Sequence, residues 1–112
     1  MRDVSTLIDI CQAIELISNY IDNISYQELL NNQEKQDAIL RRIMIIGEAT
    51  KRLSLEFRKQ HPSIPWRQIA GMRDIITHEY DNVDLEEVWT VITVNLPTLY
   101  EYIYPLLPLD ES

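Results

Sequence analysis

Residues that break helices are scarce in this sequence. Only two glycines occur in 112 residues, Gly47 and Gly71, and none of the five prolines comes before Pro62. Glycine and proline mark the turns that join short strands, so their scarcity argues against a barrel or sandwich and favours long helices. The sequence holds no repeat, low-complexity tract or interdomain linker. Its length suits one domain, which we expect to span residues 1–112.

Cysteine is nearly absent as well. Cys11 is the only one, which excludes a disulfide within the chain and is typical of a reducing compartment. No apolar run approaches the roughly 20 residues that are needed to cross a bilayer. The first residues form a helical pattern that keeps its polar side chains, unlike a signal peptide. We therefore expect a cytoplasmic protein with no membrane association.

Motifs for metals and phosphate cofactors are missing too. The sequence has no glycine-rich phosphate loop, no pair of cysteines and no HExxH motif. Its two histidines and one cysteine are widely separated, which argues against a metal site within one chain. We expect no metal ion and no cofactor.

Acidic residues dominate the total charge but are unevenly distributed. The formal net charge of −8 argues against a general nucleic-acid-binding protein. The stretch from Arg41 to Arg73, however, has eight basic residues and only two acidic ones, Glu48 and Glu56. Such asymmetry can create a local positive surface on an acidic protein. The simpler alternative is a helix with a solvated basic face.

Apolar residues at three- and four-residue spacing predict two helices in the first half of the chain. The first should run from about residue 4 to 24, with a short helical turn over 26–30. The second should run from about residue 33 to 57. Its apolar surface is wider than one stripe, which predicts contacts on two sides. Gly47 lies inside this helix at a cost of about 1 kcal/mol relative to Ala, so we expect another backbone to approach it closely.

Two further helices are predicted in the second half. Residues 61–65 should form a loop, because two prolines three residues apart disfavour helix between them. A third helix should begin at Pro65 or Trp66 and end at His78 or Tyr80. A fourth should span about 85–104, with Asp84 as its N-cap and a kink at Pro97. The fold class is therefore all-α, an antiparallel bundle of about four to five helices.

One segment concentrates reactive side chains. Over residues 72–80 it offers a permanent cation in Arg73, a titratable His78 and the phenol of Tyr80. Arginine grips phosphate through two hydrogen bonds, and histidine moves protons near neutral pH. On an ideal helix Arg73 and Tyr80 lie about 20° apart, and Arg73 and His78 about 140° apart. This spacing permits a shared site without demanding one, and ordinary polar residues at a helix end are the alternative.

The motif Arg73-x4-His78-x-Tyr80 resembles the Rx4HxY signature of HepT-like toxins in the HEPN superfamily. Further segments are similar to the family in the same order, and the similarity covers nearly the whole chain. They are the IGEA sequence of residues 46–49, the IPW and I-x-GMR sequences of residues 64–73, and a tail with Asp84, Trp89 and Leu96-Pro97. One difference is Asp74, because many family members have Asn directly after the arginine. The superfamily as a whole usually has either an acid or an amide there, so Asp74 is compatible with the resemblance.

The resemblance implies a specific function and partners. It implies a helical bundle that dimerises and places the two Rx4H motifs in a cleft, with Arg73 and His78 catalytic and Asp74 and Tyr80 supporting. The activity would be metal-independent RNA cleavage by the toxin of a type II/VII-like toxin–antitoxin system. The antitoxin would have the minimal nucleotidyltransferase fold and could attach AMP to Tyr80. A non-catalytic module that only binds such a nucleotidyltransferase, with a nucleotide in the cleft, remains an alternative.

Chemistry supports a dimer for the ribonuclease. Cleavage by the 2′-OH needs a base, an acid and positive charge on the phosphorane. One chain supplies one histidine in a plausible site, and a twofold dimer supplies two copies of His78 and of Arg73.

Other notable residues have simpler interpretations. We expect His61 to be solvent-exposed in its loop, Trp66 and Trp89 to anchor helix packing, and Cys11 to be a small core residue. Glu48 either pairs with a basic residue of the bundle or helps to orient the active site, and we favour the first.

Overall fold

The first helix, α1 (Arg2–Tyr20), buries the predicted apolar stripe. In the computed structural model the backbone is described over residues 2–78 and 83–108, and the side chains over 3–73 and 83–108. The helix ends earlier than the predicted residue 24. Asn23 takes a positive φ of 62°, which no helix accommodates. Ser25 and Glu28 then form a capping box that begins α2 (Tyr26–Leu30), the predicted short turn.

The second long helix, α3 (Gln33–Arg52), begins at the predicted residue, with Asn32 as its N-cap, but its predicted end at residue 57 is wrong. Leu53 is extended, with ψ at 141°. Ser54 starts a separate helix, α4 (Leu55–Gln60), by accepting a hydrogen bond from the backbone of Phe57. The carboxylate of Asp3 in α1 also accepts hydrogen bonds from the backbone N–H and hydroxyl of Ser54. These polar contacts divide an apolar pattern that runs through the break.

Residues 61–65 form the predicted loop, and α5 (Trp66–His78) follows it. The last predicted helix is divided into α6 (Leu85–Thr90), the π-helix η2 (Val91–Asn95) and α7 (Leu96–Ile103). Asp84 caps α6 as expected, accepting from the backbone of Glu86 and Glu87. The short 3-10 helix η3 (Tyr104–Leu106) ends this segment.

Proline explains the π-helix. Pro97 has no N–H to donate to the carbonyl of Thr93, so the regular α-helical ladder cannot continue there. The ladder widens instead, and the N–H of Leu96 donates to the carbonyl of Val91, five residues earlier. The predicted disturbance at Pro97 therefore takes the form of a π-helical segment.

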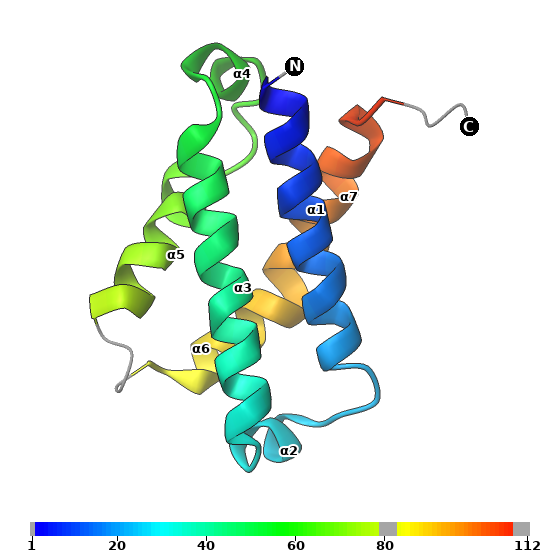
Figure 1. The fold of residues 1–112 in the computed structure, drawn as a ribbon, viewed down its shortest axis with the longest axis vertical. Coiled ribbons are helices and arrows are strands. Elements are labelled where there is room, and N and C mark those ends of the chain that lie inside the picture. Colours follow the sequence, from blue (N-terminus) through cyan, green and yellow to red (C-terminus); the bar gives the residue numbers. More distant parts are fainter. Residues whose placement is uncertain (1, 79–82, 109–112) are drawn as a thin grey trace.

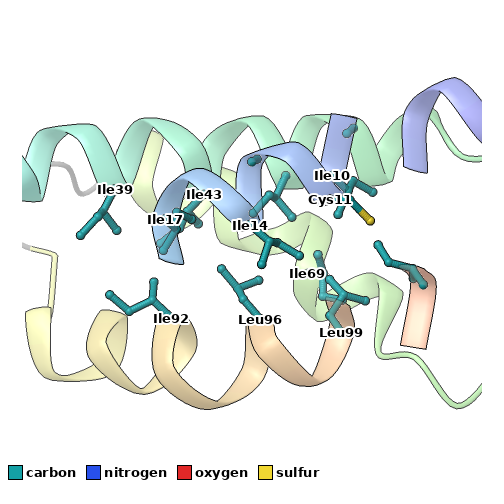
Figure 2. Packing of buried hydrophobic residues seen from close by; sticks show 14 of the residues in the cluster. Ile10, Cys11, Ile14, Ile17, Ile39, Ile43, Ile69, Ile92, Leu96 and Leu99 are labelled. Carbon is teal, nitrogen blue, oxygen red and sulfur yellow. The ribbon is translucent and has the colours of Figure 1, made fainter. Parts of the chain in front are cut away.

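The long elements form an antiparallel bundle, which confirms the predicted fold class (Figure 1). The helix α3 packs against α1 on one side and α5 on another, as its wide apolar surface predicts. The η2–α7 segment closes the core from below α1 in Figure 2, where isoleucines and leucines from α1, α3, α5 and η2–α7 converge. The labelled core residues include Ile14, Ile43, Ile69, Ile92 and Leu96.

Cys11 is a core residue, as expected. Its side chain is buried, and this burial, followed by the charge of Glu15, raises the thiol pKa to about 11. The thiol therefore stays protonated at neutral pH and is a poor nucleophile. Within the described residues, no helix has both the length and the apolar character needed to cross a membrane.

Candidate active site

The helices α3 and α5 pack closely at Gly47. A Cβ atom built on Gly47 would lie 2.6 Å from Cβ of Arg73, 3.1 Å from its backbone N and 3.3 Å from the carbonyl oxygen of Ala70. No real side chain fits at such distances, which confirms the predicted close approach. The cost of a glycine inside a helix is therefore offset by the contact between α3 and α5. This contact also holds the main chain of Arg73.

The next residue of α3 contacts the other end of the same arginine. Oε1 of Glu48 lies 3.9 Å from Nε of Arg73, and the two side chains are 45% and 38% exposed. An ion pair this exposed contributes only about 0–1 kcal/mol to stability. Its consequence is local: the Arg73 side chain is partly exposed, while its Nε atom is buried with the carboxylate of Glu48 beside it.

The beginning of α5 is anchored independently of this contact. Trp66 and Ile69 are buried in the core, and Nε1 of Trp66 donates a hydrogen bond of 2.9 Å to the carbonyl of His61. Trp66 is thus a packing anchor, as predicted. Trp89 is half-buried and packs against the ring of Tyr26. Both ends of the described part of α5, the buried Trp66 and the Gly47 contact, fix where Arg73 lies.

His61 is half-buried, so the prediction that it is exposed to solvent is wrong. Its ring lies 4.5 Å from that of Phe57 and 5.9 Å from that of Tyr102, which it meets edge-on. The prediction considered only the local loop, whereas α4 and α7 bring aromatic rings to the imidazole from both directions. His61 belongs to this aromatic cluster, at the end of α5 away from His78.

The structure places the remaining candidate residues only in part. The backbones of Asp74 and His78 belong to α5, and His78 is its last residue. Their side chains, and all of Tyr80, lie outside the described residues. The structure therefore brings Arg73 together with Glu48, and the pairing of Arg73 with His78 stays a prediction.

Some of the predicted basic surface is used within the fold. Arg52 pairs with Asp9 of α1 at 3.4 Å. Arg58 donates to the carbonyls of Lys51 and Leu53, across the break between α3 and α4. At least these two cations therefore take part in contacts within the fold.

A groove of about 590 Å³ runs along a different side of α5. It lies between α5 and the η2–α7 segment, with apolar walls that include Ile69, Met72, Leu96 and Leu99. Gly71 lines it, and a Cβ added there would meet nothing within 4 Å. The helix α5 thus turns Arg73 toward α3 and Gly71 toward the groove.

The model of the HepT-like ribonuclease family matches residues 10–106. The chain belongs to the HepT-like ribonuclease family. The resemblance of its motifs is thereby confirmed, and the two helices that meet at Gly47 both lie within the matched residues.

Individual relatives of this HepT-like chain agree with the family. "Probable ribonuclease HepT" of Thermococcus cleftensis is 40% identical over 91 residues, which are 81% of this chain and 83% of that protein. "Putative RNase TTE0752" of Caldanaerobacter subterraneus subsp. tengcongensis is 36% identical over 91% of each chain. "Gamma-glutamylcyclotransferase and putative RNase MJ0434" of Methanocaldococcus jannaschii is 39% identical over 99% of this chain, which spans about half of that longer protein. No solved structure was found to match.

The two glycines provide a matched test of the helix contact. Gly47→Ala should lower the free energy of unfolding, because overpacking costs about 1–3 kcal/mol against about 1 kcal/mol gained in helix propensity. Gly71→Ala, in an open helical position, should raise it by about 0.5–1 kcal/mol. Urea denaturation followed by circular dichroism, at one protein concentration, measures both. Equal stabilities for the two variants would contradict the close approach of α3 and α5.

Proposed function

We propose that this HepT-like protein is the ribonuclease toxin of a toxin–antitoxin system, with Arg73 and His78 as its catalytic residues. The observation that carries the proposal is the held, half-exposed Arg73. Relatives named as ribonucleases at 36–40% identity support the reaction class. We expect it to act on RNA in the cytoplasm.

The chemistry follows from what RNA supplies. The 2′-oxygen attacks the adjacent phosphorus as its proton passes to a base, and the bond from phosphorus to the 5′-oxygen breaks as an acid protonates that oxygen. The products are a 2′,3′-cyclic phosphate and a 5′-hydroxyl. Arg73 would stabilise the charge on the phosphorane through its planar fork. His78 would move the protons, which requires no metal ion, with Asp74 and Tyr80 as supporting residues.

A symmetric homodimer completes this mechanism. One His78 would act as the base and the partner subunit's His78 as the acid. The wide apolar surface of α3 was a second reason to expect a dimer, since it could also contact a partner subunit. Met44 and Ile45, which widen it, pack against the core of their own chain, so the chemical argument alone carries this proposal.

The antitoxin would be a protein of the minimal nucleotidyltransferase fold. Transfer of AMP to the hydroxyl of Tyr80 would form a phosphodiester and release pyrophosphate if ATP is the donor. The modification would place a bulky nucleotide and a negative phosphate seven residues from Arg73. That phosphate would compete with the RNA backbone for the guanidinium, so inhibition would need no change of fold.

Cleavage of single-stranded RNA by the purified protein tests the proposed reaction. Arg73→Ala should lower the rate by about 10²-fold or more, as the loss of single transition-state donors does elsewhere, and Lys should restore it only in part. His78→Ala should abolish cleavage, and EDTA should have no effect. Arg67→Ala removes an exposed arginine from the same helix and should stay close to the parent.

The outcomes separate the two functions that the sequence left open. Activity that is lost in EDTA and restored by a divalent ion would contradict the metal-independent mechanism. A folded parent protein that cleaves no RNA and still binds its nucleotidyltransferase would instead indicate a non-catalytic binding module.

The dimer is testable without any substrate. Light scattering at micromolar concentration should give twice the 13.2 kDa mass of one chain. A protein that cleaves RNA as a monomer would show that a second His78 is not required.

Modification of Tyr80 requires the antitoxin. After co-expression with the neighbouring nucleotidyltransferase gene, mass spectrometry should find the mass of AMP on the peptide that contains Tyr80. Tyr80→Phe should escape neutralisation, because it has no hydroxyl to modify. If Tyr80→Phe is neutralised as fully as the parent, tight binding by the antitoxin is the better explanation.

A further inference from the structure

Glu48 has an unexpected position for a residue in a phosphate-binding site. It is one of two acids in the stretch from Arg41 to Arg73, and its carboxylate lies 3.9 Å from the guanidinium of Arg73. A negative charge there repels an approaching RNA backbone and weakens its initial binding. Because the carboxylate of Glu48 opposes RNA binding, its place beside Arg73 needs another explanation.

The positions of Gly47 and Glu48 around Arg73 indicate what Glu48 contributes. Residues 47 and 48 contact the two ends of the same side chain: Gly47 lies against Cβ of Arg73, and Glu48 lies beside its Nε. Arginine has a long, flexible side chain, so fixing its Cβ end alone leaves the direction of the guanidinium undetermined. A second point of contact at Nε restricts that direction.

The atom that Glu48 approaches also matters. A planar guanidinium can pair with a phosphate through two hydrogen bonds either from its Nη1–Nη2 edge or from the edge that holds Nε and one Nη atom. At 3.9 Å the carboxylate attracts Nε electrostatically without a close hydrogen bond. A carboxylate beside Nε repels a phosphate from the edge that holds Nε, so we expect the Nη1–Nη2 edge to face the phosphate.

We propose that Glu48 is a positioning residue that orients the guanidinium of Arg73 toward the substrate phosphate, which rests on the proposed ribonuclease function. It acts through Arg73 and takes no proton from the RNA. The carboxylate weakens ground-state binding and improves alignment in the transition state, so its removal should lower kcat without raising KM.

Kinetics of Glu48→Gln, which keeps the shape and removes the charge, provide the first test. We expect kcat to fall about 10- to 100-fold, the scale on which misplaced groups lose rate, while KM stays the same or falls. Glu56→Gln is the matched control, because it removes the same charge from an exposed position on α4 and should leave kcat unchanged. Circular dichroism confirms that each variant is folded.

Two further comparisons distinguish positioning from other roles. In an Arg73→Lys background, Glu48→Gln should have little additional effect, because lysine has no planar fork to orient. The pH–rate profile of Glu48→Gln should be lower at every pH without losing its acidic limb. Loss of that limb would make Glu48 a general base, and an unchanged kcat would make the pair an ordinary surface contact, so either result overturns the proposal.

A readout that needs no activity keeps this test separate from the ribonuclease proposal. In nuclear magnetic resonance relaxation measurements, the Nε–Hε bond of Arg73 should move less in the parent than in Glu48→Gln. Glu56→Gln should match the parent. If the parent cleaves no RNA but shows this restriction, the proposed function fails while the orientation of Arg73 stands. If the Nε–Hε bond is equally mobile in the parent and in both variants, the positioning role is overturned.

Discussion

The contact between Gly47 and α5 is the constraint on which the candidate site depends. Because Gly47 has no side chain, α3 can approach α5 closely. The main chain and Cβ of Arg73 fill the space that a side chain at position 47 would need. Any larger residue would move α5 outward, and Arg73 with it. Glycine is otherwise unfavourable in the middle of a helix, so the position is best understood as a requirement of the site. The same turn of α3 then presents Glu48 to the guanidinium.

The rest of the bundle makes this contact possible. The helix α3 is held on its other side by α1, and buried isoleucines fix both (Figure 2). The start of α5 is held by Trp66, which is buried and bonded to the loop before it. The candidate site thus sits where one rigid helix meets another, which suits a reaction that requires a preorganised cation. The η2–α7 segment contributes the opposite wall of the core and a groove that lies on another side of α5.

Much of this arrangement is predictable from the sequence, because helix patterns and breakers are local signals. The short helix at 26–30, the loop at 61–65, the Asp84 cap and the close approach at Gly47 were all predicted and confirmed. The end of α3 was not, because the apolar pattern continues through the break, and one of the groups that bind Ser54 there, Asp3, is 51 residues away in sequence. His61 was misjudged for the same reason, since its aromatic neighbours come from different helices. Glu48 was weighed as a partner of some cation, but only the packing of α3 on α5 identifies that cation as Arg73.

The proposed function depends on one claim: α3 holds Arg73 in place so that it can bind the phosphate of RNA. The most direct measurement is the RNA cleavage rate of Gly47→Ala at a temperature where circular dichroism shows it fully folded, beside that of Gly71→Ala. The account predicts that the folded Gly47 variant loses most of its activity, because its Arg73 is displaced, while the Gly71 variant keeps its rate. A folded Gly47→Ala protein that cleaves RNA as fast as the parent would contradict it.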